Sequence, residues 1–129
     1  MDLNQYKMRA RATAVYSYGI EAALNNVLAK QDWAEFLELS YCISKLNGEA
    51  GEAGELVAKA LRDYNVSSGK IIDEDRRLEI IAELGDCLWY IANAAHQLDT
   101  SLEDLAEHNL AKLRRRQVEG KLHGSGSNR

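Results

Sequence analysis

Apolar residues recur at helical spacing along most of the chain, and this period predicts a series of helices. The first is expected from Leu3 to about Val15. Between Tyr16 and Ala34 the period is weak, and glycine and asparagine interrupt it, which predicts a loop with one helical turn at most. From Trp33 to Tyr64 the apolar pattern runs almost unbroken and predicts a long helix.

A charged stretch that begins at Asp73 opens the next expected helix, which runs to about Leu98. Residues 65–69 contain two serines and a glycine and predict a connection before it. The middle of this helix is apolar over most of its circumference, so we expect it to be buried.

A last helix is expected from Ser101 to about Val118. Thr100 and Glu103 have the spacing of a capping box at its start. Its leucines recur on one side and predict a buried face at Leu102, Leu105, Leu110 and Leu113. The tail, residues 119–129, is rich in glycine and serine and has no period.

Composition supports an all-α fold. The chain has 129 residues, 46% of them apolar, no proline and 7% aromatic residues, which favours helices over a sheet. We therefore expect one helical domain over residues 1–118, built as a bundle of about four to five helices, followed by the tail. No segment has the length and hydropathy of a membrane span.

The two cysteines, Cys42 and Cys87, each lie inside an apolar helical pattern. No signal peptide is apparent, so reduced thiols and a cytoplasmic location are expected. With these thiols in apolar positions, and without a serine, histidine and acid arrangement, the sequence offers no protein nucleophile.

Two polar stripes carry the strongest chemical signal. The first recurs at spacings of four, three, four and three on one face of the helix after Asp73, at Glu79, Glu83, Asp86, Tyr90 and Asn93. The second lies on the long helix at Glu52, Glu55, Lys59 and Arg62, with Glu49 one turn before it. If the two helices pack together, Glu52, Glu55, Glu83 and Asp86 bring four negative charges into one cleft, which calls for a bound cation.

Oxygen ligands alone favour a hard ion, Mg²⁺ or Mn²⁺. A ferritin-like di-iron bundle would need Glu-x-x-His pairs, yet Asn93 and Leu105 stand three residues before His96 and His108. A solvated acidic face is the alternative interpretation of the same spacing. On the last helix Asn109, Lys112 and Arg116 border the apolar face and form a candidate phosphate clamp.

Taken together, these segments resemble the all-α nucleoside triphosphate pyrophosphohydrolases of the MazG type. Their pattern is Glu-x-x-Glu followed, after a gap, by Glu-x-x-Asp. Here it appears as GEAGEL at residues 51–56 and AELGDCLWYIA at residues 82–92. NLAKLRRR and GKLHGSGSNR add C-terminal matches, although Ser127 stands where the family commonly has aspartate. The likeness extends from about Tyr41 to the end of the chain.

The resemblance implies hydrolysis of a (deoxy)nucleoside triphosphate to the monophosphate and pyrophosphate by a metal-activated water. It assigns Mg²⁺, or Mn²⁺, to Glu52, Glu55, Glu83 and Asp86, and substrate contacts to Asn109, Lys112, Arg116, Tyr90 and Lys59. Glu49 and Glu52 also satisfy Glu-x-x-Glu, but the GEAGE context favours Glu52 and Glu55 as the first motif. Glu49 is then expected either to hydrogen-bond to the metal ligands without binding the metal or to bind a third metal ion. A homodimer or a dimer of dimers is expected, with the active site completed across subunits.

Two other functions fit parts of the sequence. A nucleotide-sensing or regulatory module would keep the fold without hydrolysis, although intact acidic motifs argue against it. A nucleic-acid-binding protein would use the basic run at Arg114, Arg115 and Arg116. The net charge of −4 and the few aromatic residues argue against nucleic acid as a partner.

Overall fold

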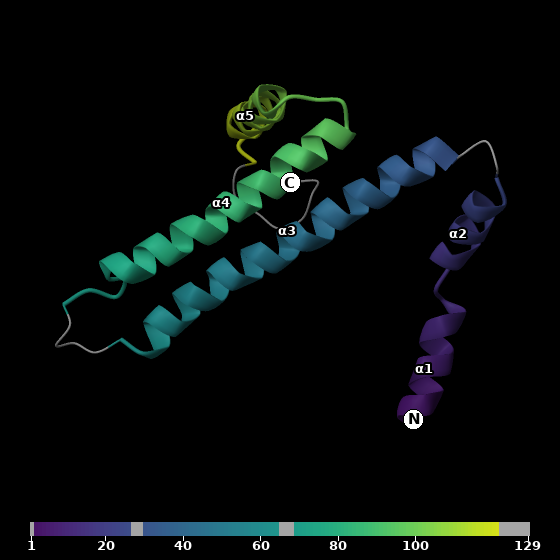
Figure 1. Ribbon diagram of the computed structural model, residues 1–129, viewed down its shortest axis with the longest axis horizontal. Coiled ribbons are helices and arrows are strands. Elements are labelled where there is room, and N and C mark those ends of the chain that lie inside the picture. The colour runs from purple at the N-terminus through teal and green to yellow at the C-terminus, as the bar shows by residue number, and fades with distance from the viewer. Residues whose placement is uncertain (1, 27–29, 65–68, 122–129) are drawn as a thin grey trace. The chain divides into compact units, whose positions relative to one another are not determined.

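The computed structural model describes residues 2–26, 30–64 and 69–121, and its regular structure there is helical throughout. It comprises α1 (Leu3–Ala12), α2 (Tyr16–Asn25), α3 (Lys30–Arg62), α4 (Glu74–Gln97) and α5 (Leu102–Val118) (Figure 1). The all-α fold expected from composition is therefore confirmed. Most of the expected connection at residues 65–69, and all of the tail after Lys121, lie outside the described residues.

The chain divides into two compact units, residues 1–37 and 38–129. In the first unit α1 begins at a capping box in which Asp2 accepts from the backbone N–H of Gln5 and the Gln5 side chain accepts from that of Asp2. The loop predicted from Tyr16 to Ala34 is wrong, because α2 occupies residues 16–25 and α3 already begins at Lys30. Good helix formers such as Ala22 and Ala23 sustain a helix there despite the weak apolar period.

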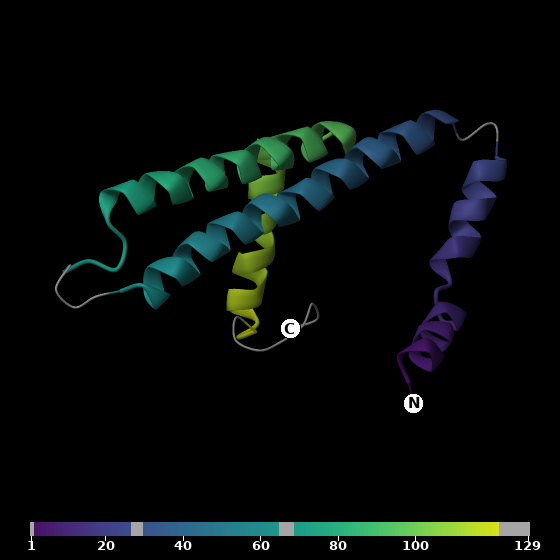
Figure 2. The ribbon, with the colours of Figure 1, turned by 60° about the horizontal axis from the view of Figure 1, so that its bottom comes forward.

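In the second unit α3 and α4 run antiparallel and lie side by side (Figures 1 and 2). The Gln97 side chain, at the end of α4, donates a hydrogen bond of 2.6 Å to Glu38, near the start of this unit. Further along the pair, the ring of Tyr41 on α3 meets that of Tyr90 on α4 edge to face. Glu49 then lies beside Asp86. Residue numbers rise on one helix as they fall on the other, which brings the two polar stripes together.

The ends of α4 and α5 follow local side-chain chemistry. Asp73 caps α4 by accepting from the Arg76 N–H, as the charged stretch predicts. The capping box of α5 is formed by Ser101 and Asp104 and not by Thr100 and Glu103, so that prediction was wrong by one residue. The chain turns through Asp99, at φ 50°, two residues before the Ser101 cap.

Gly120 ends α5 with a positive φ of 66°. Its N–H donates to the Gln117 carbonyl, and the N–H of Lys121 donates to that of Arg116 at 2.8 Å. These two bonds form a Schellman motif, which needs a left-handed residue that glycine adopts without strain. The helix therefore ends close to Val118, as the sequence predicts.

Buried hydrophobic side chains in the described residues are all small. They are Cys42, Ala53, Ala60, Cys87, Ala94 and Ala95. The expected burial of α4 is wrong for this single chain, because Leu78, Leu84 and Leu88 are each more than half exposed. On α5 the expected buried face is also exposed, at 38% for Leu102 and Leu105, 39% for Leu113 and 52% for Leu110. A single pair of long helices with one shorter neighbour leaves much of its apolar surface uncovered.

The glycines of α3 do not serve close packing within the described chain. A Cβ added at Gly48, Gly51 or Gly54 would meet no neighbouring atom within 4 Å. Tight packing of helices inside the described part of the chain therefore does not explain these glycines. Among the described helices, none combines the length and the hydropathy needed to cross a bilayer.

Candidate active site

Three carboxylates from two helices meet at the middle of the α3–α4 pair. Glu49 comes from α3, and Glu83 and Asp86 come from α4, where a spacing of three puts them on one face. One oxygen from each lies within 4.8 Å of the other two. We call these three residues the acidic cluster. Such a group of oxygens has the chemistry of a site for a hard divalent ion, so the donor set fits Mg²⁺.

Electrostatics at the acidic cluster centre on Glu83, which is half-buried. Partial burial raises the pKa of its carboxyl, and the nearby charges of Glu52, Asp86 and Glu49 raise that pKa further. Glu79 acts in the same direction. These four charges are all negative and come from α3 and α4. A site of this kind holds a proton or a cation more readily than a solitary carboxylate does.

The two glutamates assigned to the first motif differ in their surroundings. Glu52 is exposed, and its charge acts on Glu83 across the helix pair. Glu55 forms an ion pair of 3.0 Å with Lys59 on its own helix, and its side chain is 63% exposed. The structure therefore brings Glu49, rather than Glu55, next to Glu83 and Asp86. The sequence signal was available, because Glu49 and Glu52 satisfy the same Glu-x-x-Glu spacing.

Lys45 is a charged neighbour of the acidic cluster that the sequence analysis missed. Its Nζ lies 3.0 Å from Oε1 of Glu49 and 5.9 Å from the centre of the Tyr90 ring. The hydrogen bond to Glu49 raises the pKa of the lysine. Its position four residues before Glu49 on a helix is the signal that would have found it.

An aromatic group stands beside this lysine. The rings of Tyr41 and Tyr90 meet edge to face at 6.4 Å, and those of Trp89 and Tyr90 at 4.9 Å. Burial, and secondarily the neighbouring Tyr41, raise the pKa of Tyr90. Tyr41 and Trp89 are 62% and 58% exposed. Tyr90, which the resemblance places near the sugar, thus lies within one helical turn of Asp86, beside ring surfaces that are open to solvent.

On α5 the predicted clamp residues lie at their expected spacing. Lys112 and Arg116 are half-buried, and Asn109 is exposed. The carboxylates that raise the pKa of Glu83, at Glu49, Glu52, Glu79 and Asp86, come from α3 and α4. The contact of the α5 residues with phosphate stays a prediction.

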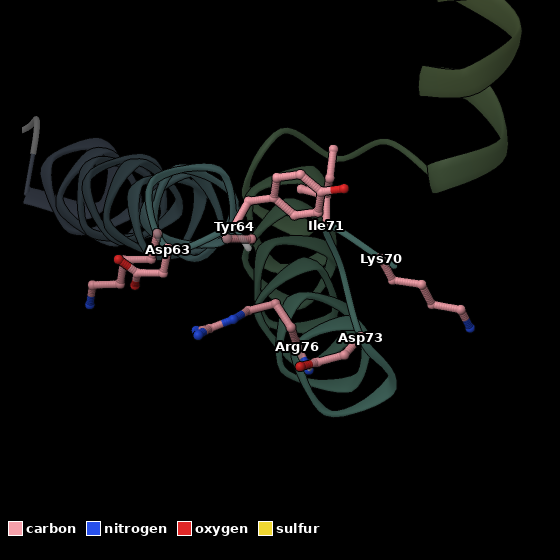
Figure 3. A pocket seen from close by; sticks show the side chains of 8 residues that line it. Asp63, Tyr64, Lys70, Ile71, Asp73 and Arg76 are labelled. Carbon is pink, nitrogen blue, oxygen red and sulfur yellow. The ribbon is translucent and has the colours of Figure 1, made fainter. Parts of the chain in front are cut away.

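A cavity of about 250 Å³ lies at the far end of the α3–α4 pair, where the two helices connect (Figure 3). Arg76 on α4 reaches toward Asp63 at the end of α3, and its charge helps to lower the pKa of that carboxyl, after the stronger effect of Arg62. Lys59 lines the cavity and also pairs with Glu55. The cavity is lined by charges of both signs, and through Lys59 it adjoins Glu55 on α3.

Comparison with known proteins agrees with this arrangement. The family described as "MazG nucleotide pyrophosphohydrolase domain" matches residues 38–120, almost the span of the second compact unit. The chain is also similar to the Gene 37 protein of Mycobacterium phage L5, with 36% identity over 129 residues that cover 100% of both chains. No solved structure matches it. The family match spans well over half of the chain and includes both acidic motifs, so this protein belongs to the MazG nucleotide pyrophosphohydrolase family.

Proposed function

We propose that this protein hydrolyses a nucleoside triphosphate, in its ribo or deoxy form, to the monophosphate and pyrophosphate in the presence of Mg²⁺. The observation that carries the proposal is the acidic cluster, in which three carboxylate oxygens from two helices lie within 4.8 Å of one another. Family membership supports a nucleotide substrate and a divalent ion.

Each acidic residue has a distinct place in this proposal. Glu49, Glu83 and Asp86 hold Mg²⁺ directly, and Glu52 joins them from the adjoining turn of α3. Glu55 contributes only after it leaves its ion pair with Lys59. When bound, Mg²⁺ neutralises charge on the triphosphate and lowers the pKa of a water molecule, which supplies the nucleophile that the side chains lack. Mn²⁺ suits the same oxygens.

Other side chains orient the substrate. Tyr90 contacts the sugar beside the metal-binding carboxylates, because it follows Asp86 by one turn of α4. Lys59 neutralises phosphate charge at the end of the site that adjoins the cavity between the ends of α3 and α4. Asn109, Lys112 and Arg116 bind phosphate oxygens from α5, where their spacing presents them along one side of the helix.

We propose that a second copy of the chain completes this site. The leucines of α4 are more than half exposed in one chain, and among the described residues the buried hydrophobic side chains are those of alanine and cysteine. Packing two copies through these surfaces would cover apolar area of the kind that stabilises homodimers. Sedimentation at micromolar concentration should show a dimer or a tetramer, and a catalytically active monomer would contradict the shared site.

A panel of ribo- and deoxyribonucleoside triphosphates tests the reaction. With Mg²⁺ we expect equimolar monophosphate and pyrophosphate, and with EDTA we expect neither. Glu83→Gln should remove the activity, since it deletes a ligand of the acidic cluster. Glu74→Gln is the matched control, because Glu74 lies on the same helix but is paired with Arg77 in the first turn.

Each unfavourable result of the panel has a definite meaning. Activity in Glu83→Gln equal to wild type would refute the assignment of the site. Nucleotide binding without pyrophosphate release from any member of the panel would refute the enzyme and indicate a nucleotide-sensing module.

A further inference from the structure

Lys45 lies between the acidic cluster and the ring face of Tyr90. Its Nζ is 3.0 Å from Glu49 Oε1 and 5.9 Å from the centre of the Tyr90 ring. The side chain of Glu49 is only 12% exposed, whereas that of Lys45 is 43% exposed. A lysine with access to solvent is therefore paired with a carboxylate of the acidic cluster that is largely shielded from solvent.

The charge of Lys45 acts in opposite directions on the two proposed ligands of the acidic cluster, the divalent ion and the triphosphate. A divalent ion held by Glu49 sits close to the lysine ammonium, and two positive charges at such a distance repel each other. A triphosphate chain carries several negative charges and is attracted to the same ammonium. Lys45 should thus weaken the binding of metal alone and strengthen the binding of metal together with nucleotide.

The lysine has the freedom to exchange partners. Its side chain is flexible and carries three rotatable donors. The ring face of Tyr90 provides a second favourable contact along the way, because a cation within about 6 Å of an aromatic ring is attracted to it. Neither contact needs the backbone of α3 to move.

We propose that Lys45 is a substrate-binding residue that changes partner. It pairs with Glu49 when no nucleotide is bound, and it pairs with an anionic oxygen of the polyphosphate when Mg²⁺ and nucleotide bind together. This inference rests on the proposed function, since it requires both the metal and the polyphosphate at the acidic cluster.

The proposal predicts that one substitution of Lys45 raises the affinity for metal alone and lowers the affinity for metal together with nucleotide. In Lys45→Met, Mn²⁺ alone should bind about three- to tenfold more tightly, because the repelling charge is gone. The Mn²⁺ complex of a non-hydrolysable triphosphate analogue should bind about tenfold more weakly, because a charge-assisted hydrogen bond to phosphate is lost. A purely structural role for Lys45 would weaken both.

Titration of free Mn²⁺ by electron paramagnetic resonance measures the first affinity, and calorimetry with an analogue bridged by an imido group between the α- and β-phosphates measures the second. Lys45→Gln should change both affinities in the same directions as Lys45→Met does. Lys45→Arg should keep both affinities close to wild type because it keeps the charge. Arg62→Met is the matched control, since Arg62 lies on the same helix and pairs with Asp63 at 2.6 Å. Circular dichroism checks that each variant keeps its helix content.

The outcomes separate this proposal from the proposed function. If wild-type protein binds no Mn²⁺, the proposed function itself fails. If wild type binds Mn²⁺ but the neutral Lys45 variants leave either affinity unchanged, or lower both, the partner exchange is refuted. An equal effect in Arg62→Met would also refute it, because it would show a general effect of net charge.

Discussion

The register of the first acidic motif can be decided by comparing Glu49→Gln with Glu55→Gln. Glu49 lies within 4.8 Å of Glu83 and Asp86, whereas Glu55 is paired with Lys59 and largely exposed. Both substitutions keep the size of the side chain and remove one negative charge from the same helix. If the geometry of the acidic cluster governs metal binding, only the first substitution removes a ligand.

Mass action sets the expected magnitude. At a Mg²⁺ concentration of about one hundred times Kd, a bound ion stabilises the folded protein by about 2.7 kcal/mol. Loss of one carboxylate ligand should weaken the affinity by about one hundredfold, since even substitutions beyond the direct ligands cost ten- to one-hundredfold. At the same Mg²⁺ concentration Glu49→Gln would then gain only about 0.4 kcal/mol, while Glu55→Gln should keep nearly the whole gain.

Urea unfolding followed by circular dichroism, in EDTA and in Mg²⁺, measures this gain for the three proteins. In EDTA both variants should stay close to wild type. Glu49→Gln loses the ion pair with Lys45 but is relieved of repulsion from two carboxylates, and Glu55→Gln loses an exposed ion pair that contributes little. If Glu55→Gln abolished the Mg²⁺-dependent gain while Glu49→Gln retained it, the assignment of the metal to Glu49 would be wrong and the GEAGE register would hold.

Because the pKa of Glu83 is raised in the folded protein, the folded, metal-free protein binds a proton at Glu83 more tightly than the unfolded chain does. The free energy of unfolding should therefore rise as the pH falls from neutral toward 4.5, the ordinary pKa of a glutamate. Glu83→Gln should flatten that rise. Ser101→Ala removes the acceptor for the Asp104 N–H and should lower stability by about 1 kcal/mol in thermal unfolding, with Thr100→Ala as a near-neutral control; equal losses would contradict the observed cap. Gly54→Ala should raise the stability of the metal-free protein by up to about 1 kcal/mol, because its Cβ meets nothing within 4 Å, and a loss instead would place a second chain against this face.

The helices that carry the proposed site were predictable from the sequence. The structure has α3, α4 and α5 where the apolar periods predict helices, and the observed ends differ from the predicted ones by a few residues. These helices are predictable because periodicity and caps depend on residues that are close together in the sequence. The region of α2 was not predictable in this way. Its apolar period is weak, and the helix there depends on the propensity of individual residues.

The burial of these helices was overestimated for a physical reason. An apolar helix face predicts that something covers it, but it does not say whether the cover belongs to the same chain. Leu84 and Leu88 stay more than half exposed in the chain described here. The apolar period therefore predicts that another surface covers the helix, but it does not show whether that surface belongs to the same chain or to a second copy.

Residue spacing alone placed Glu83 and Asp86 on one face and gave three glutamates on α3 from which the metal ligands could come. Choosing among those glutamates needed the tertiary structure, because the register between two antiparallel helices is set by contacts of residues far apart in sequence, such as Tyr41 with Tyr90. That register puts Glu49 beside the α4 carboxylates and leaves Glu55 with Lys59. Periodicity reports which way a side chain points from its own helix; only packing decides what it meets there.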